Sequence, residues 1–364
     1  MTEFRLATAD DDAVLRQLLR ENGMPSWVEM SMEREPSYFA AHHMYGHDWA
    51  VLALENGRPF GMYSAAAVPV HVNGKAIGGG YLGGLRVQSS ARQRIRHLRN
   101  GYASIRKLAP VLPELAWWFT VIAAENTQAR RVLEAGLRGM PRYSPLGELT
   151  TYAISTARAR HLGLWRPAQA EDMAAMLAFH AQHASSAQLT PVLSASLVER
   201  IGLHCFWLHC EGDHIVAMAA LWDQCHFKQV VAQSYHRYLR LGLPLYNRFA
   251  HLTRRVVLPL PGQALAQSFI AFLVMQPSVQ DRLDFVRSLL SDLLSHCQTP
   301  VAALGLRSGH PLTSVVASFK PLSYRANVYA VEFDSAAQQH NWMVVQYSQK
   351  WLCYEAHTDT PESG

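Results

Sequence analysis

The sequence has 364 residues, of which 49% are hydrophobic and 17% are charged, a composition typical of globular proteins with a sizeable core. The length predicts two domains, and the formal net charge of +5 is modest. No apolar run of about 18 residues and no signal peptide is visible, so we expect no membrane partner. The five cysteines all lie in the second half, which is unlike a disulfide framework and favours a cytoplasmic protein.

In chain order, the first half alternates strands with helices. Residues 5–11 form a short strand and a polar turn, in which Thr8 and Asp11 have the spacing of a helix N-cap. An Asn-Gly turn at residues 56–57 separates two apolar runs and predicts an antiparallel hairpin. Later strands are expected at 80–87 and 117–123, and helices at 94–108 and 127–135.

The second half repeats three of these features in the same order. The matching pairs of segments are 5–11 with 166–172, 49–63 with 205–218, and 145–154 with 321–331. Alternating strands and helices in a duplicated pattern predict an α/β protein with two tandem domains. We place these domains at 1–155 and 160–335, followed by a C-terminal extension at 336–364 with a disordered end.

Two neighbouring segments of the first half carry the candidate chemistry. The strand at 79–87 contains paired glycines, and a stretch with Arg92, Arg94 and Arg96 follows it. Backbone N–H groups at a helix start and arginine side chains both bind phosphates, so this stretch is either an anion site or a solvated basic helix face. The strand at 117–123 leads into a helix that Asn126 is suited to cap.

Together these segments resemble the GNAT superfamily of N-acyltransferases. Val87 and Arg92 have the V-x-x-x-x-R spacing of that family, and E-N-x-x-A-x-x-x-L-E-x-G-L at 125–137 matches the helix that flanks the pantetheine arm of CoA. The resemblance implies that each tandem domain has a mixed, mostly antiparallel sheet flanked by helices. It also implies an acyl-CoA co-substrate, which we expect to be acetyl-CoA.

The resemblance assigns the cofactor to residues of the strand end, the basic loop and the second helix. These are Leu85, Arg86, Val87, Arg92, Gln93, Arg94, Ile95, Arg96, His97, Asn126, Ala129 and Arg130. The sequence departs from the family at Gln93, Ile95 and His97, where glycines normally let the backbone approach the phosphates. The nearby arginines could compensate as side-chain ligands.

The catalytic groups are less well defined by the resemblance. The backbone amide near 85–87 would polarise the thioester carbonyl as an oxyanion hole. The family's tyrosine general acid falls at Leu133, and Tyr143 is a candidate substitute. Tyr81 and Glu125 are candidate general bases for the attacking amine.

The second half lacks both motifs and is interpreted as a degenerate copy. Its histidine and cysteine cluster at 204–214 lacks a C-x-x-C pair, so we expect no metal site.

These observations favour an acyl-CoA-dependent N-acyltransferase that acts on a small-molecule or peptide amine. The alternative is a GNAT pseudoenzyme that binds CoA or a protein partner for regulation, because the family's glycines and tyrosine are missing. A nucleic-acid partner through the basic stretch at 86–107 is not expected, since Tyr102 is the only aromatic residue in it. The leading hypothesis requires the strands ending near Val87 and Ala123 to diverge and leave a wedge for pantetheine.

Overall fold

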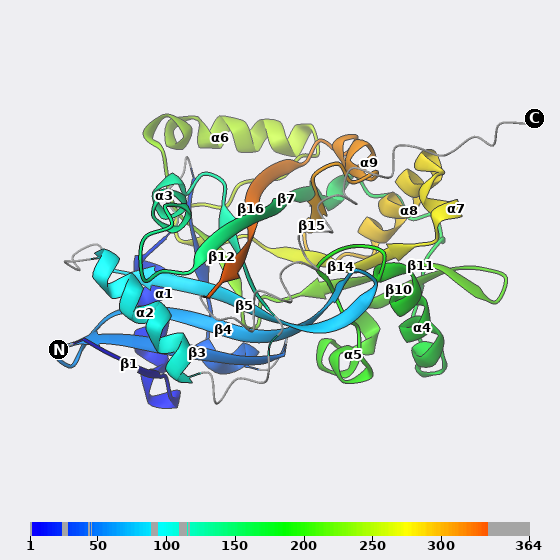
Figure 1. The fold of residues 1–364 in the computed structure, drawn as a ribbon. Coiled ribbons are helices and arrows are strands. Elements are labelled where there is room, and N and C mark those ends of the chain that lie inside the picture. Colours follow the sequence, from blue (N-terminus) through cyan, green and yellow to red (C-terminus); the bar gives the residue numbers. More distant parts are fainter. Residues whose placement is uncertain are drawn as a thin grey trace, which may run out of the picture.

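The computed structural model describes residues 2–23, 28–42, 44, 46–88, 94–108, 115 and 117–333. Within them the chain forms one thirteen-stranded mixed sheet and a separate three-stranded sheet (Figure 1). The first half contributes β1 (Thr2–Leu6), β3 (His47–Glu55), β4 (Arg58–Val72), β5 (Lys75–Val87), β6 (Trp117–Ala123) and β7 (Arg142–Ser155). The second half contributes β8 (Arg166–Pro167), β9 (Thr190–Pro191), β10 (Phe206–Glu211), β11 (His214–Asp223), β14 (Gln267–Met275), β15 (Val301–Arg307) and β16 (Leu322–Glu332).

The two halves exchange their last strands. The order along the large sheet is β1-β3-β4-β5-β6-β16-β7-β15-β14-β11-β10-β8, so β16 pairs with β6 of the first half and β7 pairs with β15 of the second. β7 and β16 also pair with each other along their length, from Leu322 opposite Ala153 to Glu332 opposite Arg142. The sheet is therefore continuous across the halves. The domain boundaries at 155 and 160 stay a prediction.

Helices cover both faces of each half. In the first half, α2 (Arg94–Leu108) and α3 (Thr127–Glu134) share one buried cluster, and α1 (Asp12–Glu21) packs on the opposite face. In the second half, α8 (Leu283–Ser295) and α9 (Thr313–Ala317) lie on one face, and α4 (Met173–Ala184) and α5 (Ala195–Ile201) on the other. The short α7 (Pro277–Gln280) precedes α8.

The same local contact opens both halves. Arg5 pairs with Asp11 at 2.7 Å, and Arg166 pairs with Asp172 at 2.6 Å. In each case the carboxylate also accepts the backbone N–H three residues earlier, which belongs to Thr8 in the first half. The N-cap predicted from Thr8 and Asp11 is thus present, with its equivalent in the second half.

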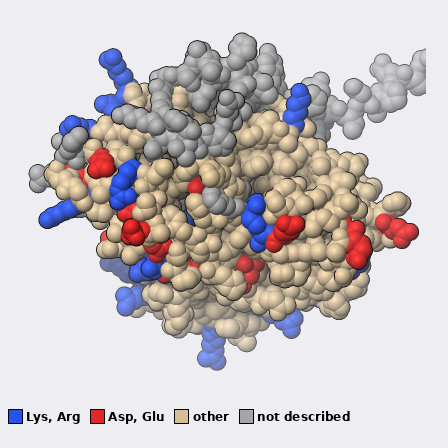
Figure 2. Space-filling view, turned by 90° about the horizontal axis from the view of Figure 1, so that it is seen from below, with Lys and Arg blue, Asp and Glu red and all other residues tan. Residues whose placement is uncertain are grey.

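The smaller sheet joins the halves on another side. It consists of β2 (Val28–Glu33), β12 (Gln229–Tyr235) and β13 (Gln263–Ala264), in the order β13-β12-β2. The helix α6 (Arg237–Leu252) lies against it on the outside of the molecule (Figure 1). None of the helices in the described part of the chain is long and apolar enough to cross a membrane. On the face shown in Figure 2, acidic and basic side chains are interspersed.

A buried carboxylate holds the connector between the halves. Asp292 on α8 is fully buried, and its two oxygens accept four consecutive backbone N–H groups, those of residues 162–165, at 2.6–3.3 Å. Burial raises the pKa of Asp292, but the N–H groups that it accepts outweigh burial and leave that pKa below its usual value. The charged carboxylate is therefore part of the folded structure.

We expect Asp292→Asn to destabilise the protein by about 2–4 kcal/mol, because an amide would turn its own N–H groups toward backbone donors. Chemical unfolding measures this loss. Asp284→Asn is the matched control, since the Asp284 side chain lies on the same helix and is 99% exposed. Because the folded-state pKa is lowered, the contribution of Asp292 is present above pH about 4 and is lost as the pH falls further. Equal unfolding midpoints for the two variants would contradict the assignment.

Candidate functional site

The strands β5 and β6 are parallel but pair only briefly. Their ladder covers Gly79–Leu82 opposite Trp117–Thr120. At its end the Thr120 hydroxyl donates to the Leu82 carbonyl at 2.6 Å. Beyond this point β5 continues beside β4, while β6 continues beside β16. The predicted wedge between the two strands is therefore present.

A bulge in β5 lies directly beyond the last pair. Ser64 of β4 is opposite Gly83, and Met62 is opposite Arg86, so β5 has one extra residue between these two pairs. A bulge takes a residue out of the ladder and re-aims its polar groups. Gly84 has φ +61°, and a Cβ there would lie 2.8 Å from the Ser64 Oγ. The site thus needs glycine for both its backbone conformation and its close approach to β4.

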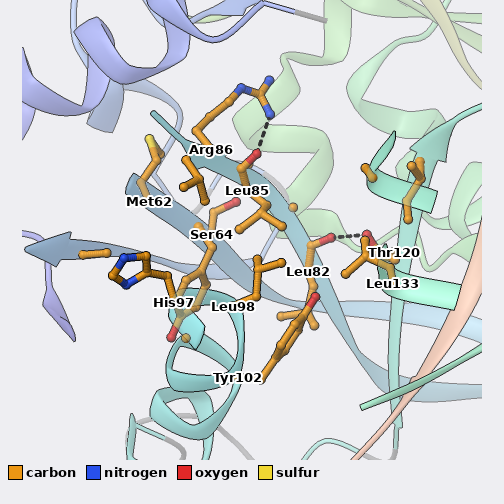
Figure 3. Close-up of a pocket in the computed structure, with 18 of the residues that line it drawn as sticks. Met62, Ser64, Leu82, Leu85, Arg86, His97, Leu98, Tyr102, Thr120 and Leu133 are labelled. Atoms are coloured by element: carbon orange, nitrogen blue, oxygen red, sulfur yellow. Dashed lines mark hydrogen bonds between the residues drawn. The ribbon is translucent and has the colours of Figure 1, made fainter. Parts of the chain in front are cut away.

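A cavity of about 180 Å³ opens from the wedge (Figure 3). Its wall combines the bulge on β5, the end of β6 and the inner faces of α2 and α3. The apolar side chains of this wall include Phe4, Phe60, Met62, Leu82, Leu85, Leu98, Ile105, Val121, Ile122 and Leu133, and Tyr63 lines it as well. The site is therefore a mostly apolar chamber that begins at an irregular strand.

Two tyrosines supply polar groups to this chamber. Tyr102 on α2 and Tyr143 on β7 both line it, and their hydroxyls are hydrogen-bonded to each other. Burial raises the pKa of Tyr102 to about 12 and raises that of Tyr143 well above its usual value. Both hydroxyls therefore keep their protons at neutral pH and can act as hydrogen-bond donors.

A second polar group, formed by Tyr81 and Arg86, lies beside the bulge, and Arg86 also lines the chamber. The Tyr81 ring lies over Gly83. A Cβ atom added at Gly83 would be 2.8 Å from the edge of that ring. Burial raises the pKa of Tyr81, and the charges of Arg34 and Arg86 act in the opposite direction. The Arg86 Nε is buried without a hydrogen-bond partner within the described residues, while its Nη1 donates to the Leu85 carbonyl at 2.9 Å.

The structure brings only part of the predicted site together. The predicted residues that line the chamber are Leu85, Arg86, Val87, His97, Asn126, Ala129 and Tyr143. Asn126 caps α3 as expected, since its side chain accepts the Ala129 N–H at 3.1 Å. His97 is buried against Phe60, with ring centroids 4.4 Å apart.

Other predicted residues lie outside the chamber wall. Arg130 is hydrogen-bonded to Glu134 and to the Tyr329 hydroxyl, both at 3.1 Å. Glu125 is exposed in the turn after β6, and Ile95 and Arg96 are exposed on α2. Arg92, Gln93 and the side chain of Arg94 lie outside the described residues. The roles proposed for all these residues, and for Tyr81 and Tyr143, stay predictions.

The sequence interpretation missed the inner face of α2. Leu98, Tyr102 and Ile105 recur at helical spacing and point into the chamber. This periodicity was available in the sequence. The long-range partners of these residues, Phe4 on β1 and Tyr63 on β4, had no local signal.

The corresponding strands of the second half also pair only briefly. β14 and β15 also pair over a short stretch, Gln267–Phe269 opposite Val301–Ala303. Beyond it, Ile270, Leu304 and Leu306 belong to the buried core formed with α8 and α9. The interpretation of the second half as a degenerate copy stays a prediction.

The predicted absence of a metal site rests on the 204–214 segment. There the His209 Nδ1 lies 2.7 Å from the Leu164 carbonyl, in reach of a hydrogen bond. Within the described residues, the only cluster with metal-ligand spacing is His161, Asp292 and His296. The Asp292 oxygens are already engaged by the connector N–H groups.

No family model and no curated protein sequence matches this chain. Solved structures do match it. Saccharomyces cerevisiae N-myristoyltransferase with bound myristoyl-CoA has a TM-score of 0.60 and 11% identity, over 92% of this chain and 83% of that one. A conserved protein of unknown function from Enterococcus faecalis V583, described as a probable N-acyltransferase, has a TM-score of 0.52 and 9% identity, over 94% and 74%. A GCN5-related N-acetyltransferase from Anabaena variabilis has a TM-score of 0.49 and 11% identity, over 90% and 72%.

Identities this low establish the fold alone. Two of these three structures have TM-scores above 0.5, and each aligns with more than nine-tenths of this chain, so the likeness includes both halves. The chain therefore has the GNAT fold, as its strand and helix segments at 79–108 and 117–143 predict.

Proposed function

We propose that the protein transfers an acyl group from acyl-CoA to an amine of a small molecule or peptide. The observation that carries this proposal is the wedge between β5 and β6, with a glycine bulge at its mouth and a chamber behind it. Pantetheine would lie in the wedge in place of the missing ladder. The amine acceptor would approach from the face of Tyr81 and Arg86.

The bulge supports the acyl-transfer step. The attacking amine forms a bond to the thioester carbonyl carbon, and negative charge develops on the carbonyl oxygen. A backbone N–H freed from the ladder near Leu85 would stabilise that charge. The C–S bond then breaks, the amine loses a proton, and the CoA thiolate gains one.

The tyrosines suit proton donation better than proton abstraction. Tyr81 and Tyr143 both have raised pKa values because they are buried, so neither is a tyrosinate at neutral pH. Tyr143 lines the same chamber as Leu133, the position of the family's general acid. We therefore assign Tyr143 to protonation of the leaving thiolate and leave the amine's proton to water or to Glu125.

The chamber also bears on the length of the acyl group. It reaches Ala53 on β3 and Phe4 on β1, which lie two and three strands away from β5. At about 4.8 Å per strand, the chamber extends roughly 10 Å sideways from the wedge, beneath α2. An acetyl group would fill only the part of the chamber next to the wedge. The acetyl-CoA expected from the sequence is thus the smallest donor that fits, and the apolar wall favours a longer chain.

The first prediction from this proposed function concerns the donor. We expect acetyl-, octanoyl- and myristoyl-CoA to bind in isothermal titration, with the longer chains tighter, and to release thiol when amino acids, polyamines or short peptides are added. Ala129→Phe should abolish both signals because Ala129 faces the wedge. Gln128→Phe adds the same ring on the exposed side of α3 and should leave both unchanged.

These measurements separate the two hypotheses. Binding without thiol release for every amine would support the pseudoenzyme alternative. If no acyl-CoA binds to the wild-type protein, or if Ala129→Phe behaves like wild type, the donor site proposed here is wrong.

The second prediction concerns the bulge. Gly84→Ala should lower kcat by about 10²-fold or more, as for loss of an oxyanion donor, with a smaller effect on donor binding. Gly57→Ala is the control, since Gly57 also has positive φ, +76°, but lies in the β3–β4 turn with open space around it. Similar kcat values for the two variants would show that the bulge does not stabilise the oxyanion.

The third prediction concerns the thiolate. Tyr143→Phe should lower kcat by about 10²-fold, within the range for a general acid, while donor affinity stays unchanged. Tyr102→Phe removes only the hydrogen-bond partner of Tyr143 and should have a smaller effect. Because the pKa of Tyr143 is raised, wild-type activity should show no loss from Tyr143 deprotonation below pH about 10. Full activity of Tyr143→Phe would exclude this role.

A further inference from the structure

The helix α6 presents a row of large apolar side chains to solvent. Tyr238, Leu241, Leu245, Phe249 and Leu252 are between 50 and 83% exposed. Their spacing of three or four residues places them on one side of the helix. Exposed apolar residues are common singly, but a contiguous row marks an interaction surface. We call these five residues the α6 stripe.

The orientation of the stripe is set by the other side of the helix. Leu239 and Leu243 pack on β12 with Ala232 and Tyr235, and Ala250 is fully buried. The Asn247 side chain is bonded to both the N–H and the carbonyl of Leu258, which holds the following loop against the helix. Two apolar faces thus exist on one helix, and within the part of the chain that the structure describes only one of them packs on the fold.

A row of positive charge runs beside the stripe. Arg237, Arg240 and Arg248 are exposed on α6 at positions one residue before stripe residues. Arg254, just after the helix, is exposed as well. The segment from 224 to 280 contains no Asp or Glu at all. The charge beside the stripe is therefore not balanced by neighbours along the chain.

This charge pattern distinguishes between two partners for the stripe, a second copy of the chain and an anionic lipid surface. A second copy that paired through α6 would bring arginines against arginines with no acidic residue of this segment to match them. An anionic lipid surface complements both features, because leucines enter the acyl region while arginines reach the headgroups. Residues 238–252 extend for about 21 Å along the helix axis, enough to lie in the plane of a membrane.

We propose that α6 is an amphipathic membrane-surface helix that docks the protein on bilayers containing anionic phospholipid. This function is independent of the acyl transfer proposed above. The expectation of no membrane partner rested on the lack of a spanning segment, and docking through the surface of one helix needs no such segment. The contact is peripheral and reversible.

Vesicle co-sedimentation of the full chain tests the proposal. We expect binding to vesicles with roughly one quarter phosphatidylglycerol in phosphatidylcholine, weaker binding to pure phosphatidylcholine, and a decrease with added salt. The double variant Leu241→Gln, Leu245→Gln should bind at least about tenfold more weakly, because two leucines no longer leave water. Arg240→Gln, Arg248→Gln should lose most of the preference for the anionic vesicles.

The control is the double variant Leu162→Gln, Leu283→Gln, which changes two leucines, 49 and 44% exposed, outside α6. It should bind vesicles like wild type. Thermal unfolding of all variants shows whether each is folded. The proposal is overturned if the wild-type chain does not bind either vesicle, if both leucine pairs behave alike, or if sedimentation velocity shows a wild-type dimer that Leu241→Gln, Leu245→Gln dissociates.

Discussion

The short ladder between β5 and β6 is the constraint on which the site depends. Parallel strands normally pair along their length, because each unpaired backbone group that is buried costs free energy. Here the backbone groups along one edge of β6 pair with β16 over Trp118–Ala123. This pairing holds β6 in the sheet even where it does not pair with β5. The wedge therefore lies between one strand held by β4 and another held by β16.

The bulge and the chamber follow from that divergence. Once β5 leaves β6, its far end pairs with β4, and the glycines there permit the bulge opposite Met62 and Ser64. The space beneath α2 is lined by side chains of alternate strand positions such as Tyr63 and Leu82. Residues of the opposite parity, including Tyr81, face the other side. One strand thus separates a donor chamber from an acceptor face.

Local features of this fold could be predicted from the sequence, and long-range ones could not. The Asn56-Gly57 turn has the positive φ values of a tight hairpin turn, and Asn126 caps its helix, because these residues act through their own backbone neighbourhood. The exchange of β7 and β16 has no local signal, since either partner would accept the same apolar strand. The exposed side of α6 was also hidden, because an apolar helix stripe normally indicates burial.

The second half contributes a strand that supports the candidate site. Its own strand β15 carries core residues such as Leu304 and Leu306. Yet β16 comes from this half and pairs with β6, and Arg130 on α3 bonds to Tyr329 of β16. Without the second half, β6 would lose its pairing with β16. It would then either pair further with β5 or lose its regular strand structure. The second half therefore supports the candidate site of the first half through β16.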